Sequence, residues 1–205
     1  EEYRIQTEES SAWTDEFLSQ RSALSNEAHR IHAERDDRIR RMFGEVARKL
    51  SLMQGDAKVT RDIYPVFDAQ LPSDANERIC VWVRDGWSSD ENSVRADVRQ
   101  AGNQSPTVFV FIPKRSADDL RHHLIDYKAA SATLDKRGSP NTPEGTEAKA
   151  AMETTKQTAE GKIRELLSEA FSGARVFQGG GNEILGNNLQ EMVLEAANNS
   201  LQRLY

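Results

Sequence analysis

Residues 79–116 read ICVWVRDGWSSDENSVRADVRQAGNQSPTVFVFIPKRS, and this stretch predicts the centre of the fold. It contains two nearly continuous apolar runs, Ile79–Val83 and Thr107–Ile112, which are rich in β-branched and aromatic residues. Short runs of this composition are typical of buried strands. The segment between them is long enough for a helix, and a strand-helix-strand connection of this length implies that the two strands are parallel.

The residues between the two runs carry the start and stop signals of a helix. Ser89 or Asp90 can cap its amino terminus, and Gly102 can end it. Val94 and Val98 fall on one face of this helix, which predicts that it packs on the sheet. Because ligands of parallel sheets bind at the carboxyl ends of the strands, the residues after each run are the first place to seek a site.

Asp85 follows the first predicted strand, where aspartates of phosphoryl-transfer folds bind magnesium or act as nucleophiles. The neighbouring residues do not complete such a motif. Trp87 stands where a haloacid-dehalogenase-like enzyme has a second aspartate, and Gly86 stands where a Walker-type ATPase has an acidic residue. The competing interpretation is a turn, since aspartate-glycine pairs are common in turns. Asp85 is therefore a candidate catalytic residue with a structural alternative.

Three polar residues, Lys114, Arg115 and Ser116, follow the second predicted strand and precede a predicted helix. This geometry is suited to anion binding, so they are candidate ligand-binding residues. The alternative is a solvent-exposed turn in which Ser116 caps the helix. The glycines at 179–181 also precede a helix, but Glu183 would bring negative charge to a bound phosphate. A turn between two short extended pieces is the better account of these glycines.

The amino-terminal region predicts a long amphipathic helix from about residue 12 to residue 53, or two abutting helices, with Gly44 as a weak point. Arg35 interrupts its otherwise apolar stripe. Four arginines of this region are candidates for contacts with DNA: Arg35, Arg38, Arg41 and Arg48. The alternative is a solvated face of mixed charge with ion pairs four residues apart.

Further helices are expected after Ser116, after Thr142 and from about residue 187, and a short strand at residues 174–178. The sequence thus predicts a mostly helical α/β fold, with a small sheet built on a parallel strand-helix-strand core and flanked by long amphipathic helices. We expect two parts: a long helical arm at residues 1–55, and an α/β domain with a helical layer at residues 56–205.

The composition indicates a mildly acidic protein, with a formal net charge of -6 and 29% charged residues. No apolar run approaches the roughly 20 residues that cross a bilayer, so no membrane association is expected. The single cysteine, Cys80, favours a reducing cytoplasm. The four histidines offer no convincing set of metal ligands, so neither a metal nor another cofactor is expected in this segment. The charged start EEYRIQ, without methionine, suggests an excised segment of a longer protein.

Three runs carry a resemblance to a known family: VWVRDGWSSDENSVRADVRQAGNQSPTVFVFIPKRSADDLR (81–121), LDKRGSPNTPEGTEAKAAMETTKQ (134–157) and SGARVFQGGGNEI (172–184). They resemble the large P-loop ATPase of bacteriophage-exclusion (BREX) defence systems, the BrxC and PglY family, from about Leu50 to the end of the chain. The family implies a bacterial cytoplasmic protein that uses ATP and magnesium. It also implies work with other defence components, among them a DNA methyltransferase. This chain has no GxxxxGK[ST] motif, so it resembles a segment outside the nucleotide-binding core.

These observations favour a structural and interaction segment of a BREX ATPase that is not catalytic in isolation. Its expected role is assembly of the defence complex or coupling of nucleotide state to partners. Expected partners are other BREX components, DNA in the full complex, and a second copy through the long helices. Two alternatives stay open. One is a magnesium-dependent phosphoryl-transfer enzyme that uses Asp85, and the other is DNA binding through the basic face of the amino-terminal helix.

Overall fold

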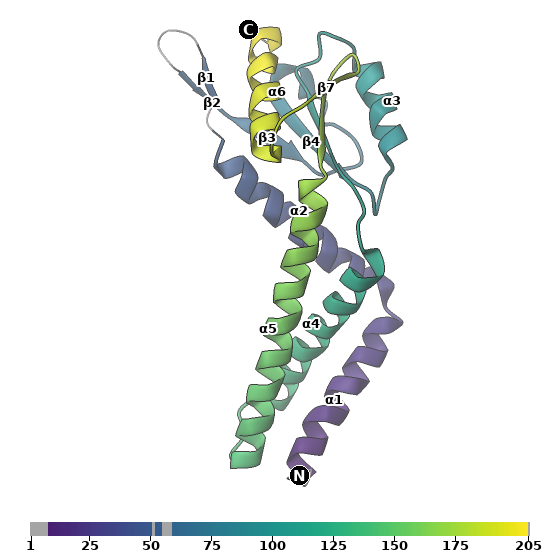
Figure 1. Ribbon diagram of the computed structural model, residues 1–205, viewed down its shortest axis with the longest axis vertical. Helices are drawn as coiled ribbons and strands as arrows, with labels where there is room; N and C mark the ends of the chain where they lie inside the picture. Colours follow the sequence, from purple (N-terminus) through teal and green to yellow (C-terminus); the bar gives the residue numbers. More distant parts are fainter. Residues whose placement is uncertain (1–7, 51, 55–58, 205) are drawn as a thin grey trace. The chain divides into compact units, whose positions relative to one another are not determined.

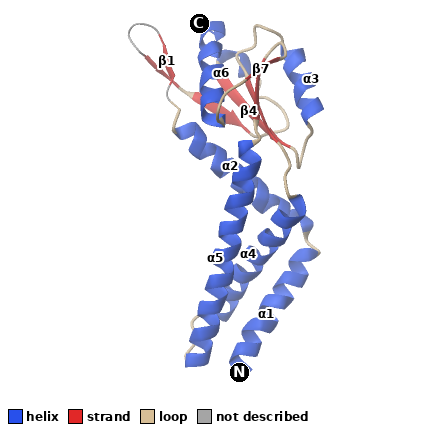
Figure 2. Ribbon diagram, viewed as in Figure 1, coloured by secondary structure: helices blue, strands red, loops and turns tan. Residues whose placement is uncertain are grey.

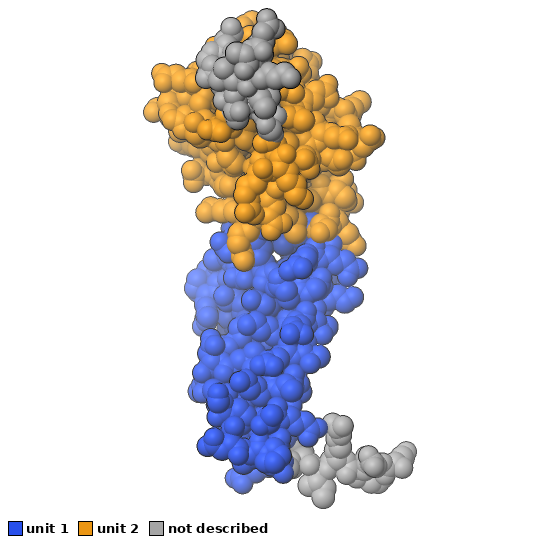
Figure 3. Space-filling view, turned by 90° about the vertical axis from the view of Figure 1, so that its left-hand side faces the viewer, with its two compact units in different colours: residues 1–38, 116–167 blue, residues 39–115, 168–205 orange. Residues whose placement is uncertain are grey.

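The computed structural model describes residues 8–50, 52–54 and 59–204. The chain forms a mostly helical α/β fold with a five-stranded mixed sheet, which confirms the predicted fold class (Figures 1 and 2). It divides into two compact units (Figure 3). Unit 1 comprises residues 1–38 and 116–167, and unit 2 comprises residues 39–115 and 168–205. The boundary predicted between residues 55 and 56 lies outside the described residues.

The helices and strands have the following bounds. The helices are α1 (Glu8–Ser25), α2 (Ala28–Arg48), α3 (Glu91–Ala101), α4 (Ala117–Arg137), α5 (Pro143–Ser172) and α6 (Leu189–Leu204) among the described residues, with a short 3-10 helix at Ala75–Glu77. The strands are β1 (Leu52–Gln54), β2 (Val59–Arg61), β3 (Ile63–Val66), β4 (Ile79–Asp85), β5 (Val108–Ile112), β6 (Arg175–Gln178) and β7 (Asn182–Ile184).

The sheet of unit 2 has the strand order β3-β4-β5-β6-β7. β4 and β5 are parallel, with Val81 beside Val108 and Asp85 beside Ile112, as the sequence predicts. β3 is also parallel to β4, whereas β6 runs antiparallel to β5. The predicted strand at residues 174–178 is β6, and its partner β7 is the second extended piece expected after the glycines. The parallel pair therefore places Asp85 and Lys114 after neighbouring strand ends.

Helix α3 covers one face of this sheet. The core cluster on that face comprises Val66, Ala75, Cys80, Trp82, Val94, Val98, Phe109, Phe111 and Phe177. Val94 and Val98 of α3 are 0% and 1% exposed, and burying each side chain stabilises the fold by about 1.5–3 kcal/mol. The helix begins as predicted, because the Asp90 carboxylate accepts a hydrogen bond from the Ser93 backbone N–H at 2.7 Å. It ends as predicted at Gly102.

An arginine of β4 adds a polar contact to the same face. The Arg84 guanidinium donates to Asp97 of α3 at 2.5 Å and to the Ser89 hydroxyl at 3.0 Å. It also lies over the Trp82 ring, with its central carbon 4.6 Å from the ring centroid. Arg84 therefore ties α3 to the sheet while covering an apolar ring.

β3 is an edge strand of this sheet. Pro65 lies within it, beside Val81 of β4, so the proline does not interrupt the pairing. This position suits proline, because an edge strand needs backbone donors on one side only. Beyond β3, the Trp82 indole N–H donates to the Asp68 carbonyl at 2.9 Å, which holds the following loop on the sheet.

The three glycines at 179–181 form the turn of the β6–β7 hairpin. Gly180 and Gly181 have φ angles of +94° and +102°, which side chains other than glycine's rarely adopt. The prediction of a glycine turn between two short extended pieces is confirmed. The helix that follows begins at Leu189, and the Asn188 side chain accepts from the Glu191 N–H at 2.9 Å.

The predicted amino-terminal helix is two abutting helices, α1 and α2. They meet at Asn26 and Glu27, and not at Gly44, which lies inside α2. The Ser25 hydroxyl donates to the Arg21 carbonyl and the Asn26 amide donates to the Ser22 carbonyl, so side chains compete for the last carbonyls of α1. The expectation of a helix as far as Met53 is wrong, since residues 52–54 form β1.

Unit 1 is built from α1, α4, the larger part of α5 and the first part of α2, and α1 packs closely on α4. Trp13, Ala130 and Met152 form an apolar cluster, with Phe17, Leu134 and Ala148 packed against it. Gly138 ends α4, and α5 begins at Pro143, directly after Thr142 as expected. None of the described helices is both long and apolar enough to span a bilayer.

Candidate functional site

The carboxyl ends of β4 and β5 come together as the sequence predicts. The Gly86 N–H donates to the Ile112 carbonyl at 2.8 Å. A Cβ on Gly86 would lie 2.5 Å from the backbone nitrogen of Lys114, so only glycine fits this close approach of two chain segments. The turn after Asp85 and the segment after Ile112 are therefore in direct backbone contact.

The carboxylate of Asp85 is engaged by its own turn. Its Oδ1 accepts hydrogen bonds from the Trp87 N–H at 2.9 Å, the Ser88 N–H at 3.0 Å and the Ser88 hydroxyl at 3.2 Å. An aspartate that accepts from the backbone two and three residues later is the acceptor of a side-chain-capped turn. These three hydrogen bonds support the interpretation of Asp85 and Gly86 as a turn. No group of three or more histidine, cysteine or carboxylate residues able to hold a metal occurs in the described part of the chain.

Arg115 and Ser116, two of the three candidate ligand-binding residues, take separate places in the fold. The Arg115 guanidinium lies against Gly173, where its Nη2 is 2.6 Å from the position that a Cβ would take. Gly173 directly follows α5, so the cation lies at the carboxyl end of that helix, where positive charge is favourable. Ser116 occupies the cap position of α4 but makes no capping hydrogen bond with its side chain, and its φ is +48°. The expectation that the Ser116 side chain caps the helix is therefore wrong.

The four candidate DNA-binding arginines of α2 divide into two pairs. Arg35 and Arg38 are each only 9% exposed, whereas Arg41 and Arg48 are exposed. Residues three apart share a helix face, so Arg35 and Arg38 lie on the side of α2 that packs inside the protein. Arg35 donates to Asp36 at 3.0 Å and 3.1 Å. The four arginines therefore do not form a single solvent-facing basic stripe.

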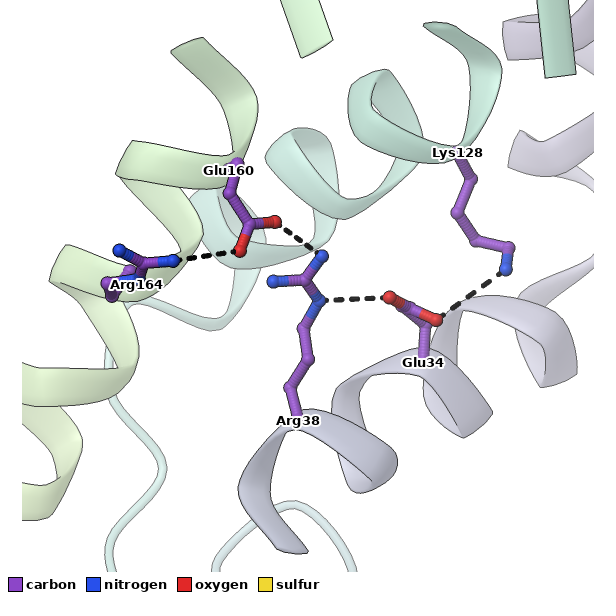
Figure 4. Close-up of polar contacts among 5 residues, drawn as sticks. All are labelled: Glu34, Arg38, Lys128, Glu160 and Arg164. Carbon is purple, nitrogen blue, oxygen red and sulfur yellow. Dashed lines mark hydrogen bonds and ion pairs between the residues drawn. The ribbon is translucent and has the colours of Figure 1, made fainter. Parts of the chain in front are cut away.

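Arg38 is the centre of a cluster of charged side chains in unit 1, drawn in Figure 4 and called the Arg38 cluster below. Its Nη2 donates to Glu160 of α5 at 2.6 Å, and its Nε donates to Glu34 of its own helix at 2.9 Å. Both carboxylates have a second cation: Arg164 lies 3.4 Å from Glu160, and Lys128 of α4 lies 3.7 Å from Glu34. The cluster thus joins α2, α4 and α5 through charge.

An aromatic ring completes the surroundings of Arg38. The guanidinium carbon lies 4.5 Å from the centroid of the Tyr127 ring on α4, and the Lys156 amine lies 5.6 Å from the same centroid. Such cation–π contacts are strongest where water is excluded. Arg38 thus makes two charge-assisted hydrogen bonds and one aromatic contact. Because it is largely buried, water competes little with these contacts.

The ionisation of the Arg38 cluster follows from these contacts. Burial disfavours the charge of Arg38, but hydrogen bonds to Glu160 and Glu34 outweigh it and raise the pKa of the guanidinium above its usual value. The hydrogen bond from Arg38 lowers the pKa of Glu160, although burial opposes this effect. Both groups are therefore charged across the physiological pH range.

Glu34, Tyr127 and Glu160 were not identified from the sequence. Part of the signal was present, because Glu34 and Arg38, and likewise Glu160 and Arg164, are four residues apart and can pair on one helix. Arg35 also stood within an apolar stripe, which indicated a buried arginine in this region. The contact between Arg38 and Glu160 spans 122 residues of sequence, and no local pattern predicts it.

An open pocket of about 480 Å³ lies elsewhere in unit 1. It is lined by Glu8, Glu9, Ala12, Arg137, Thr142 and Glu144. A Glu9 carboxylate oxygen lies 2.8 Å from the position of a Cβ on Gly145, in the first turn of α5, where negative charge complements the helix dipole. Glu9 therefore has a structural role at this helix end.

Comparisons with known proteins add no relative. No protein-family model, no curated protein and no solved structure matches this chain.

Proposed function

We propose that this chain is a structural and interaction segment and not a catalyst in isolation. The observation that carries the proposal is the engagement of Asp85 Oδ1 by three donors of its own turn. A catalytic or metal-binding carboxylate directs its oxygens toward a ligand, whereas this one stabilises the loop between β4 and α3.

The contacts of the other candidate residues support the same proposal. Arg115 lies at the end of α5, and Arg38 binds two carboxylates of the chain itself. Charged groups that form such internal contacts position helices relative to one another. The segment then serves as a scaffold whose helices present surfaces to partners.

The resemblance supplies the biological setting of the proposal. The chain acts in the bacterial cytoplasm as part of a BREX ATPase of the BrxC and PglY family, with ATP and magnesium bound elsewhere in the parent protein. Its partners are other defence components, with DNA reached in the full complex and self-association through the long helices. Its contribution is complex assembly or the coupling of nucleotide state to those partners.

An in-frame deletion of this segment from the gene that encodes it tests the setting. We expect loss of phage resistance, measured as plating efficiency, together with reduced recovery of partners and altered ATP turnover of the purified complex. If complex assembly, turnover and resistance all persist without the segment, the proposed role is wrong.

A second experiment addresses the enzyme alternative directly. The isolated chain is incubated with magnesium and either ATP or a generic phosphoester, beside an Asp85→Asn variant that keeps the acceptor oxygen but removes the charge. We expect no phosphate release from either protein. Turnover by the wild type that disappears in the variant would make Asp85 catalytic and overturn the proposal.

A further inference from the structure

A single interhelical ion pair joins α2 to α5 within the Arg38 cluster. Arg38 Nη2 and Glu160 Oε2 are 2.6 Å apart, and Arg38 is 9% exposed. Breaking a buried ion pair is normally expensive, because separation or removal of one partner leaves the other charge buried and unpaired. Whether the pair acts as a permanent joint therefore depends on what each partner would contact after separation.

Each partner of this pair already holds a second partner on its own helix. Glu34 lies four residues before Arg38 on α2, and Arg164 lies four residues after Glu160 on α5. Arg38 also keeps Tyr127 of α4 beneath its guanidinium. If the first half of α5 moves away, the Arg38–Glu160 pair is lost together with the packing of Met152 and the contact of Lys156 with Tyr127, but neither charge of the pair is left alone. The usual penalty for breaking a buried pair is therefore reduced.

The apolar packing of α5 is uneven along its length. Among the described residues from Pro143 to Glu160, the buried apolar side chains of α5 are Met152 and Ala159. The next two turns bury Ile163 and Leu167. Since hydrophobic stabilisation follows the apolar area removed from water, the first half of α5 is held less firmly than the turns after Glu160.

We propose that the first half of α5, residues 143–160, is a releasable strap, and that the Arg38–Glu160 pair is its latch. In the closed state Arg38 bridges Glu34 and Glu160. In the released state Arg38 remains on Glu34 and Tyr127, and Glu160 remains on Arg164. The device is a two-state contact within unit 1, and it does not depend on the proposed role in phage defence.

Native-state hydrogen exchange of the α5 amides measures this release. A helix of this length without tertiary support is marginal in water, so its amides exchange when the strap opens. The experiment uses the full chain and compares Arg38→Gln with Arg164→Gln. Both substitutions remove a cation from the Glu160 carboxylate. Arg38→Gln removes the latch, whereas Arg164→Gln removes the cation that stays with Glu160 in the released state.

The two variants are expected to shift exchange in opposite directions. Arg38→Gln should speed exchange of amides 148–160 by about tenfold, because the closed state loses its buried pair. Arg164→Gln should slow exchange of the same amides by about twofold, because the released state loses the only partner of Glu160. Added salt should speed exchange of the wild type, since screening weakens the latch.

Amides of α3 around Val94, in the core cluster of unit 2, provide the internal reference and should not change. Arg164 is 71% exposed at its side chain, so its substitution tests the proposal even if Arg38→Gln impairs folding. Opposite shifts in the two variants support the latch. Shifts of the same sign, no shift with Arg164→Gln, or equal acceleration of the α3 amides would overturn it.

Discussion

Unit 1 joins its helices in two chemically different ways. The cluster of Trp13, Ala130 and Met152 joins α1, α4 and α5 through apolar contact. The Arg38 cluster joins α2, α4 and α5 through charge. The apolar contact stabilises by removing hydrocarbon from water, and it depends little on ions or pH. The charged contact must first offset the desolvation of each ion, so its net contribution is smaller and depends on conditions.

Burial alone does not determine how much a side chain contributes to stability. Trp13 is 2% exposed and Arg38 is 9% exposed, so both side chains are almost completely covered. Their expected contributions to stability differ because Trp13 buries an apolar ring, whereas Arg38 buries a charge whose carboxylate partners each have a second cation. Three changes test this difference, beginning with the largest expected effect, and a fourth in unit 2 gives the effect of a local turn for comparison.

Trp13→Ala is expected to destabilise the protein most. Removing a buried tryptophan side chain costs about 3–5 kcal/mol through lost transfer free energy and the cavity that remains. Chemical denaturation followed by helical circular dichroism measures the loss, which should vary little with salt. Leu18→Ala is the matched control on α1, since Leu18 is 51% exposed, and it should change the free energy of unfolding by less than about 0.5 kcal/mol. Similar losses in both variants would contradict the assignment of Trp13 to the core.

Arg38→Met should cost about 1–2 kcal/mol, less than the roughly 3–5 kcal/mol typical of a broken buried ion pair. The reason is that Glu160 retains Arg164 and Glu34 retains Lys128. The same denaturation measurement applies. Arg30→Met is the control on α2, because Arg30 pairs at the surface with Glu27, just before the helix, and should contribute less than about 0.5 kcal/mol. A loss as large as that of Trp13→Ala would remove the contrast between the two clusters.

Acidification should weaken only the charged contact. The folded-state pKa of Glu160 lies below its usual value of 4.5, so the ionised carboxylate stabilises the fold at pH values above 4.5. This contribution is lost as the pH falls from 4.5 through the lowered pKa. We expect the stability difference between wild type and Glu160→Gln to shrink over this window, as measured by denaturation at a series of pH values. A difference that stays constant as the pH falls would show that the Glu160 charge contributes nothing.

Asp85→Ala should have the smallest effect on stability, about 1 kcal/mol, because it removes the acceptor of a local turn. Asp85→Asn keeps an oxygen at the same place and should cost less than Asp85→Ala. Thermal unfolding of the two variants beside wild type makes the comparison. Equal destabilisation by both substitutions would mean that the charge of Asp85, and not its hydrogen bonds, matters to the fold.

The sheet was predictable because its signals are local and strong. β4 and β5 are nearly continuous apolar runs, and Asp90, Gly102 and Gly138 mark helix ends through contacts within a few residues. β7 was expected only as a short extended piece after the glycines, because its three residues carry too few apolar side chains to form a pattern. The antiparallel direction of β6 is set by its distant pairing with β5, which no local sequence feature encodes.

The candidate site was less predictable, because the sequence position of a charged residue does not show whether its side chain is buried or exposed. The Asp85 turn was foreseen as an alternative because an aspartate-glycine pair has a known local geometry. Arg35 and Arg38 were assigned to a basic face, although the apolar stripe that contained Arg35 already indicated burial. Neither the partner of Arg38 on α5 nor the ring of Tyr127 could be inferred, because helix packing decides which distant residues meet.

Pro65 on the edge strand β3 has a consequence for aggregation. The outer edge of a sheet can template a strand from another molecule, and this is how many sheet proteins form fibrils. A proline has no N–H to offer, so a strand that approaches β3 finds a missing donor in a strand of only four residues. Replacing Pro65 with a β-branched residue would restore that donor and make this edge a better template for fibril growth.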